Sequence, residues 1–340
     1  VHVYQRPDNR AMARDSNVQA DAHTFRSGVT TIVDAGSSGW RDLPEFRRRV
    51  VEKSRTRVLA FVNISGSGMG LDKEDDLGEL DVEATVRAVK EHRDIVVGIK
   101  SAHFGGPGWE SIDAAARASR AVEMPVMVDF GYFREERPYH QLVTSRLRPG
   151  DISTHMFRGP VPYMGADGHV LPYLKQARAR GVLFDVGHGG GSFVFRTMVP
   201  AVKDGFYPDT ISTDLHTGSM NGAMMDMLTT MSKFLVAGMP LQAVVKASTD
   251  APARAIKRLE LGHLTVGAEA DVAVLRVVEG RFGYADAARG TIHGNQRLAC
   301  ELTLRAGRVV WDYNARTGTA YERLPPTYGV RPVDKVIVPH

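Results

Sequence analysis

Apolar, strand-like runs that alternate with helix-like stretches constrain the fold of this chain most strongly, because such alternation builds parallel βαβ units. The runs lie at 30–36, 57–65, 94–100, 125–131, 151–157, 182–188 and 209–216. Val, Ile and Leu dominate their centres, as expected of parallel strands buried on both faces. Residues 1–4 (VHVY) supply an eighth run, as the tail of a strand. The pattern predicts an α/β fold, a (β/α)8 TIM barrel.

The connecting segments and the end of the chain complete this organisation. Amphipathic stretches at 81–92 and 111–122 and helical stretches at 220–238 and 240–248 predict helices. A doubly wound open sheet is the competing architecture, but no Gly-rich phosphate fingerprint follows the first strand. Near residue 260 the pattern changes to short strands joined by Gly-containing turns. We therefore predict a barrel at 1–258, a small β-domain at 259–314 and an extended tail at 315–340.

Composition excludes several classes of protein. The 43 basic and 39 acidic residues nearly balance and the basic ones are scattered, so a nucleic-acid partner is not expected. The single Cys300 rules out an internal disulfide and a Cys-based zinc motif. No run approaches the ~20 apolar residues of a membrane span. We expect a cytoplasmic homo-oligomer with a small-molecule substrate; a targeting segment stays open because the chain begins without Met.

Polar side chains end most of the strand-like runs. Each alone is more often structural, but a TIM barrel brings the carboxyl ends of its strands to one mouth, where its chemistry lies. The strand-end residues are His2, Lys100, Asp129, His155, His188, Asp214 and His216. Imidazoles, carboxylates and a lysine that converge there predict a divalent-metal site.

Several motifs resemble the amidohydrolase superfamily, most of all its amidohydrolase/deacetylase branch, which includes dihydroorotases and N-acyl-amino-acid deacetylases. They are GIK at 98–100, STDLH at 212–216, GVTTIVDAGSSG at 28–39, LRPGDISTHMF at 147–157, FDVGHGGGSF at 184–193 and LGHLTVGAEADVAVL at 261–275. The resemblance runs from residue 1 to about 314. It implies a small β-domain of the urease-like composite kind, whose N-terminal strands are absent here. We therefore expect a fragment of a longer chain or a protein that has lost its first strand.

The resemblance also implies a metal centre with two divalent ions, Zn²⁺ in the first instance, bridged by a carboxylated Lys100. His2 matches the second histidine of the family's His-x-His pair, while the first would precede Val1. The other matching ligands are His155 and Asp214, and Asp129 stands where the family commonly has a histidine. A carboxylate there hardens the site and favours Mn²⁺ as an alternative ion. His103, three residues past Lys100, is an alternative source of the missing imidazole.

The mechanism implied by the resemblance is attack of a metal-activated hydroxide on an amide or ester carbonyl, with Asp214 as general acid/base. Substrate contacts are expected from His188, from His216 and from the glycine-rich turn, which includes Gly190, Gly191 and Ser192. A tight strand-to-helix turn is the alternative role of those glycines. The competing function is a non-catalytic barrel that serves assembly or binding.

Overall fold

A six-stranded parallel sheet with strand order β1-β2-β3-β4-β5-β6 forms the body of the computed structural model, which describes residues 1–4 and 17–334. Its strands are β1 (Thr31–Gly39), β2 (Arg57–Asn63), β3 (Val96–Ser101), β4 (Val126–Val128), β5 (Ile152–Ser153) and β6 (Leu183–Phe184). Each strand pairs in parallel with the next. Six of the seven predicted central runs therefore contain strands, although the last three are shorter than predicted.

Two further segments close this sheet into a ring. Segment 209–215 follows β6, because the Val186 N–H donates to the Thr210 carbonyl at 3.1 Å. Residues 1–3 fill the remaining gap: the His2 N–H donates to the carbonyl of Leu215 and the Ala35 N–H donates to the carbonyl of Val1, both at 2.9 Å. The (β/α)8 barrel is thus confirmed. Residues 1–3 and 209–215 occupy its first and eighth strand positions, where a few hydrogen bonds replace regular ladders.

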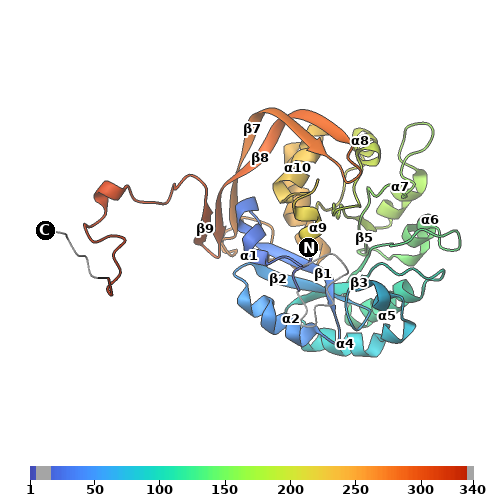
Figure 1. The fold of residues 1–340 in the computed structure, drawn as a ribbon. Coiled ribbons are helices and arrows are strands. Elements are labelled where there is room, and N and C mark those ends of the chain that lie inside the picture. The colour runs from blue at the N-terminus through green and yellow to red at the C-terminus, as the bar shows by residue number, and fades with distance from the viewer. Residues whose placement is uncertain (5–16, 335–340) are drawn as a thin grey trace.

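Helices surround the ring, as Figure 1 shows for α2, α4 and α5 along its outer edge. The α-helices are α1 (Ala20–His23), α2 (Leu43–Arg49), α3 (Leu71–Glu74), α4 (Val82–Glu91), α5 (Glu110–Val122), α6 (Tyr139–Gln141), α7 (Pro172–Ala179), α8 (Phe195–Lys203), α9 (Thr217–Met220), α10 (Met227–Val236), α11 (Leu241–Ser248) and α12 (Asp250–Ala255). Short turns of other helix types are η1 (Phe25–Ser27), η2 (Val51–Lys53), η3 (Leu77–Glu79), η4 (Leu142–Arg146) and η5 (Tyr321–Arg323).

The single helix predicted over 220–238 is wrong, since α9 and α10 are separate. Asn221 and Gly222 follow the short α9, and both residue types are poor helix formers. Asp226 then begins α10 as its N-cap, with its carboxylate accepting the Thr229 N–H at 2.7 Å. We call residues 221–226 between the two helices the cavity connection, because Met225 and Asp226 line the cavity described in the next section.

Apolar side chains form two layers. The larger lies between the sheet and the helices and includes Phe46, Val62 and Phe157, all nearly inaccessible. The smaller fills the interior of the barrel with Leu59 and Phe61 among others. Strand side chains alternate between these layers, which is why the central strands are apolar almost throughout.

The small antiparallel sheet after the barrel consists of β7 (Val272–Ala285), β8 (Thr291–Arg305) and β9 (Arg308–Asp312). The prediction of short strands was wrong: β7 and β8 have 14 and 15 residues. Gly280 lies inside β7 where the pairing register shifts, so this glycine marks a bulge rather than a turn. Figure 1 shows β7 and β8 arching over α10.

The end of the chain runs away from the body in Figure 1. Residues 315–334 are exposed almost throughout and contain only η5; the extended tail at 315–340 stays a prediction. Residues 5–16 and 335–340, which fall in the predicted barrel and tail, lie outside the described residues. The domain boundaries after 258 and 314 stay predictions. None of the helices in the described part combines the length and apolar character that a membrane-spanning helix needs.

Candidate active site

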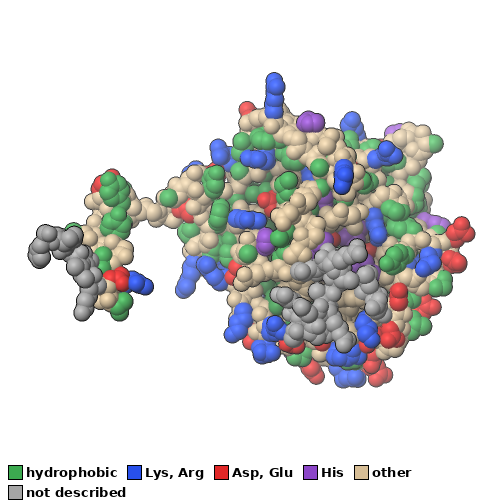
Figure 2. Space-filling model, viewed as in Figure 1, with side chains coloured by type: hydrophobic (Ala, Val, Ile, Leu, Met, Phe, Trp, Pro, Cys, Tyr) green, Lys and Arg blue, Asp and Glu red, His purple; other side chains and the backbone are tan. Residues whose placement is uncertain are grey.

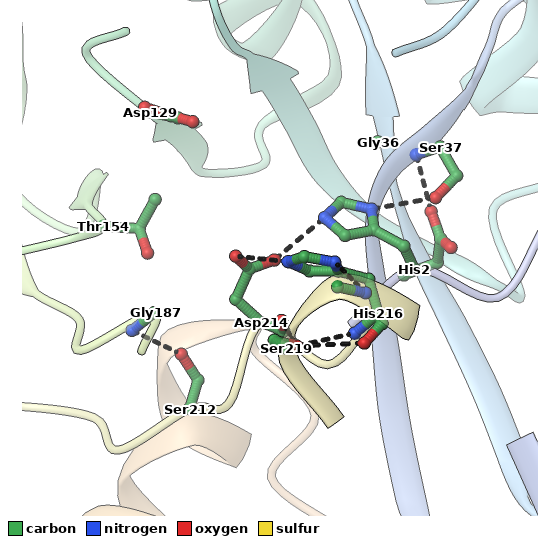
Figure 3. Close-up of polar contacts among 12 residues, drawn as sticks. His2, Gly36, Ser37, Asp129, Thr154, Gly187, Ser212, Asp214, His216 and Ser219 are labelled. Carbon is green, nitrogen blue, oxygen red and sulfur yellow. Dashed lines mark hydrogen bonds and ion pairs between the residues drawn. The ribbon is translucent and has the colours of Figure 1, made fainter. Parts of the chain in front are cut away.

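His2 and Asp214 meet at the seam where the barrel closes (Figure 3). The His2 ring is buried, with its Nδ1 2.9 Å from the Ser37 hydroxyl and its Nε2 2.9 Å from Asp214 Oδ1. Burial alone would raise the pKa of Asp214, but the hydrogen bond and charge of His2, and then the charge of His155, hold that pKa well below its usual range. Asp214 is therefore a carboxylate at neutral pH.

Asp129 is the centre of a second cluster. Its Oδ2 lies 3.1 Å from His103 Nε2 and 3.3 Å from His155 Nε2. The Nδ1 of His103 lies 3.2 Å from the buried carboxylate of Glu74. Burial opposes ionisation of Asp129, yet the charges of His155 and His103 keep its pKa well below the usual value. The structure thus brings His103, the predicted alternative ligand, to the same carboxylate as His155.

Lys100 on β3 is 3% exposed. Within residues 1–4 and 17–334 its amine has no hydrogen-bond or ion-pair partner. Gly36 makes room for its stem: a Cβ added to Gly36, which has a φ of +91°, would lie 2.7 Å from Lys100 Cγ. A buried lysine without an acidic partner is costly, so a role for the amine other than a salt bridge has to be sought.

Two of the polar strand-end residues and the predicted alternative ligand His103 adopt the left-handed backbone conformation. The φ angles are +49° at His103, +59° at His155 and +49° at Asp214. Each costs about 1–2 kcal/mol for a residue with a Cβ. Such strain clusters at functional sites, where surrounding contacts hold it in place. Sequence reasoning could not have found this feature, because these residues carry no local signal for it.

Sequence reasoning also missed Asp185, which lies buried beneath the mouth. Its carboxylate accepts hydrogen bonds from the hydroxyls of Thr154 at 2.6 Å, Thr210 at 2.5 Å and Ser212 at 2.7 Å. The Ser212 hydroxyl also accepts the Gly187 N–H at 2.9 Å, as Figure 3 shows. The signal available was the recurrence of hydroxyl residues in the two segments that flank β6, Thr154 after β5 and Thr210 and Ser212 in segment 209–215.

The Gly187 peptide links this network to His155. Its carbonyl accepts a hydrogen bond from His155 Nδ1 at 2.6 Å, so that the other ring nitrogen faces Asp129. Gly187 has a φ of +48°, and a Cβ there would lie 2.3 Å from the Thr154 hydroxyl. Only glycine fits this position. Nδ1 held by a carbonyl is the arrangement that fixes a histidine for metal binding through Nε2.

The predicted substrate contact of His188 does not fit the structure. Its ring is fully buried and does not line the cavity described below. Its Nδ1 lies 2.9 Å from the Gly189 carbonyl and its Nε2 lies 2.7 Å from Lys233 Nζ. Both nitrogens are engaged inside the protein, because the ring packs at 4.3 Å against Phe193 instead of pointing into the mouth.

The remaining predicted substrate contacts do border the cavity: these are Gly190, Gly191, Ser192 and His216. His216 is also the N-cap of α9, with Nδ1 accepting the Gly218 N–H at 3.1 Å. Its Nε2 lies 3.9 Å from Asp214 Oδ2.

A cavity of about 830 Å³ opens among these side chains and reaches through the barrel towards the small sheet. The predicted ligands all line it, namely His2, Lys100, Asp129, His155 and Asp214. Figure 2 shows histidine side chains near the centre of this face, inside a rim of charged residues. Its volume is within the range of small-molecule pockets.

The chemistry of these donors fits divalent ions, although the described side chains pair with one another. No group of three or more His, Cys, Asp or Glu side chains in the described ranges is arranged to hold a metal ion. The Nε2 atoms of His2 and His155 instead face carboxylate oxygens, while each Nδ1 is held by a Ser hydroxyl or a carbonyl. Imidazole nitrogen and carboxylate oxygen are ordinary ligands of Zn²⁺ and Mn²⁺.

Fold and site together define a (β/α)8-barrel protein whose polar cluster lies at the carboxyl ends of its strands, and the comparisons with known proteins make this more specific. The chain belongs to the amidohydrolase family. The model of the "Amidohydrolase family" matches residues 194–296. A deacetylase of Enterococcus faecalis is 31% identical over 261 residues, which cover 74% of this chain and 70% of that protein.

Two other relatives and two solved structures agree with this assignment. Deacetylases of Brucella anthropi and Agrobacterium fabrum are 33% and 34% identical over 74% of this chain, which spans only 64% and 63% of their lengths. An adenine deaminase superposes with a TM-score of 0.83 at 28% identity, covering 92% of this chain and 84% of its own. A dihydroorotase does so with a TM-score of 0.76 at 28% identity, covering 88% and 79%.

Proposed function

We propose that this protein is a divalent-metal-dependent hydrolase that cleaves an amide or ester bond of a small carboxylate-bearing molecule. The observation that carries the proposal is the convergence of His2, Lys100, Asp129, His155 and Asp214 on one cavity, with the buried amine of Lys100 unpaired within the described residues. Acids, imidazoles and a lysine in a barrel mouth are the groups that metal-assisted hydrolysis requires.

The metal ligands would come from both sides of the mouth. His2 and Asp214 would serve one ion, and Asp129 and His155 the other, with His103 as the alternative imidazole beside Asp129. When bound, such ions polarise a carbonyl and lower the pKa of a water. The Lys100 nitrogen would add to the carbon of CO₂ and release one proton, giving an anionic carbamate in place of the unpaired amine. Among residues 1–4 and 17–334 no acidic side chain pairs with this amine, which supports the role.

Asp214 would move the proton. The carboxylate is ionised at neutral pH and borders the cavity, so it would accept a proton from the attacking water. It then delivers that proton to the leaving nitrogen or oxygen. Its Oδ2 faces the backbone of Gly189. We call residues 187–192 the glycine turn, of which Gly187, Gly190, Gly191 and Ser192 line the cavity.

The glycine turn would receive the carboxylate of the substrate. Gly190, Gly191 and Ser192 border the cavity, and successive backbone N–H groups in a turn can attract an anion. His216 borders the same space. We propose N-acyl amino acids, cyclic amides or acylated 2-hydroxy acids as substrates, a choice that is compatible with relatives named deacetylase and dihydroorotase.

The test combines metal analysis with a substrate screen. Elemental analysis of the product of the complete gene, purified without chelator, should find about two divalent ions per chain. The same protein should hydrolyse members of a panel of N-acetyl amino acids, cyclic ureides and O-acetylated 2-hydroxy acids, and lose this activity after dialysis against chelator. Protein with neither metal nor turnover would contradict the proposal and favour a non-catalytic barrel. Homo-oligomeric assembly stays a prediction, to be checked by light scattering.

A further inference from the structure

Lys233 on α10 is a buried amine that the proposed reaction does not use. Its side chain is fully buried, and no carboxylate among the described residues forms an ion pair with it. Its Nζ lies 2.7 Å from His188 Nε2 and 2.6 Å from the Ala223 carbonyl, above the ring of Phe193. Burying a lysine without an acidic partner is unfavourable, so these two contacts need an explanation.

The contacts determine the proton positions on His188. The Gly189 carbonyl can only accept a hydrogen bond and a protonated Lys233 amine can only donate, so His188 Nε2 has to accept. Nδ1 then carries the ring proton and donates it to the Gly189 carbonyl at 2.9 Å. Burial, and then the charge of Lys233, lower the pKa of His188 to about 3. Burial also lowers the pKa of Lys233 to about 7, against the opposing charges of Asp286 and Asp226.

The neighbours of His188 on both sides touch the proposed machinery. The carbonyl of Gly187 accepts the hydrogen bond of His155 Nδ1. Gly189 has a φ of +53°, and a Cβ there would lie 2.4 Å from Asp214 Oδ2. His188 therefore lies between two glycines that contact the proposed site. Gly187 contacts His155, a proposed metal ligand, and Gly189 lies against Asp214, the proposed proton carrier.

The other contact of Lys233 reaches a different wall of the cavity. Ala223 belongs to the cavity connection, and the neighbouring Met225 and Asp226 line the cavity. Next to Lys233 on α10, the Ser232 hydroxyl accepts the Leu298 N–H of β8 at 3.0 Å. The Lys233 amine therefore links the glycine turn to the cavity connection. Its helix, α10, is in turn hydrogen-bonded to the small sheet.

We propose that Lys233 and His188 form a positioning pair that sets the place of the glycine turn, and through it the orientation of His155 and Asp214. This inference rests on the proposed function, since it assigns the pair a role in the geometry of that site. Lys233 does not line the cavity and would act only through His188 and Ala223. Removal of its amine should loosen the turn and weaken metal binding while the barrel stays folded.

Nuclear magnetic resonance of ¹⁵N-histidine-labelled protein tests the pair directly, without zinc or substrate. Native His188 should show the neutral form protonated at Nδ1 from pH 5 to pH 8. In Lys233→Met its Nε2 signal should lose the shift of a hydrogen-bond acceptor, and the His155 signals should move with it. The surface pair of His169 and Asp204 provides an internal control, whose signals should not change.

Zinc affinity gives a readout that a purely structural role would not move. In competition with a chromogenic chelator, Lys233→Met should bind Zn²⁺ about tenfold or more weakly, as expected when a group that orients a ligand is lost. The matched control is Lys175→Met, which removes a half-exposed lysine paired with Asp204 and should leave the affinity unchanged. Native zinc affinity together with native His155 signals in Lys233→Met would overturn the proposal.

Two further experimental outcomes have a defined interpretation. If circular dichroism shows that Lys233→Met does not fold, His188→Gln replaces it: the glutamine keeps an acceptor for Lys233 but loses the bond to Gly189, so unchanged His155 signals there would overturn the pair. If the native chain binds no zinc, the proposed function fails. The His155 and His188 signals still decide whether the pair positions the turn.

Discussion

Gly187→Ala tests whether the glycine turn is held as rigidly as the contacts around it indicate. The added Cβ would lie 2.3 Å from the Thr154 hydroxyl and 2.6 Å from His155 Nδ1. The hydroxyl cannot rotate away freely, because it donates to the buried carboxylate of Asp185 at 2.6 Å. Either that hydrogen bond or the position of the turn has to change.

The magnitude follows from two contributions. A Cβ at a φ of +48° costs about 1–2 kcal/mol relative to glycine. Loss of the hydrogen bond from Thr154 to the Asp185 carboxylate costs a further ~1.5–3 kcal/mol, as is usual for bonds to charged groups. We therefore expect Gly187→Ala to lower the free energy of unfolding by about 2.5–5 kcal/mol.

Urea unfolding measures this change, with Gly205→Ala as the matched control. Gly205 has a φ of +74° and no atom within 4 Å of an added Cβ, so its substitution carries only the backbone cost of about 1–2 kcal/mol. The difference between the two variants isolates the steric contribution. Equal midpoints and slopes for both would refute the reasoning, because the turn would then be free to move away from Thr154.

Three further predictions concern two residues of the mouth and the buried His188 behind it. Asp214→Asn should keep the circular dichroism spectrum but reduce kcat by about 10²–10⁴-fold, as for loss of a general acid/base, and near-native turnover would argue against that role. Lys100→Ala should lose bound metal on elemental analysis, with partial recovery in short carboxylic acids that imitate the carbamate; full metal occupancy would make the lysine structural. Burial lowers the pKa of His188 from 6.5 to about 3, so the unfolded chain binds a proton that the folded chain does not, and stability falls as the pH drops from 6.5 towards 3. Urea unfolding across this range should show a shallower fall for His188→Gln, and parallel curves would contradict the shift.

The ring of parallel strands could be predicted because the sequence pattern of each strand and helix is local. Strands buried on both faces are apolar along their length, and helices such as α4 and α5 show their own period, so each βαβ unit can be recognised separately. The barrel then dictates that strand ends meet. This is why His2, Asp129 and Asp214 could be placed around one mouth before their distances were known.

The direction of individual side chains could not be predicted in the same way. His188 stands at a strand end like the others, yet it turns inward to a lysine 45 positions later in the chain. Lys233 itself lies in MLTTMSKFLV, where a lysine reads as the polar face of a helix. The lengths of β7 and β8 were missed because a glycine inside a bulged strand looks like a glycine in a turn. These features depend on tertiary partners that no local pattern encodes.

The seam of the barrel has a consequence for how the protein folds. β1 to β6 pair with their neighbours in chain order, so the curved sheet can grow by successive short-range steps. Closure of the ring is different, since the hydrogen bond between the His2 N–H and the Leu215 carbonyl joins segments that lie at opposite ends of the barrel sequence. Contacts so distant along the chain are expected to form late. His2 and Asp214 lie on the two sides of that seam, so the metal binding proposed for them should return only with the slowest phase of refolding.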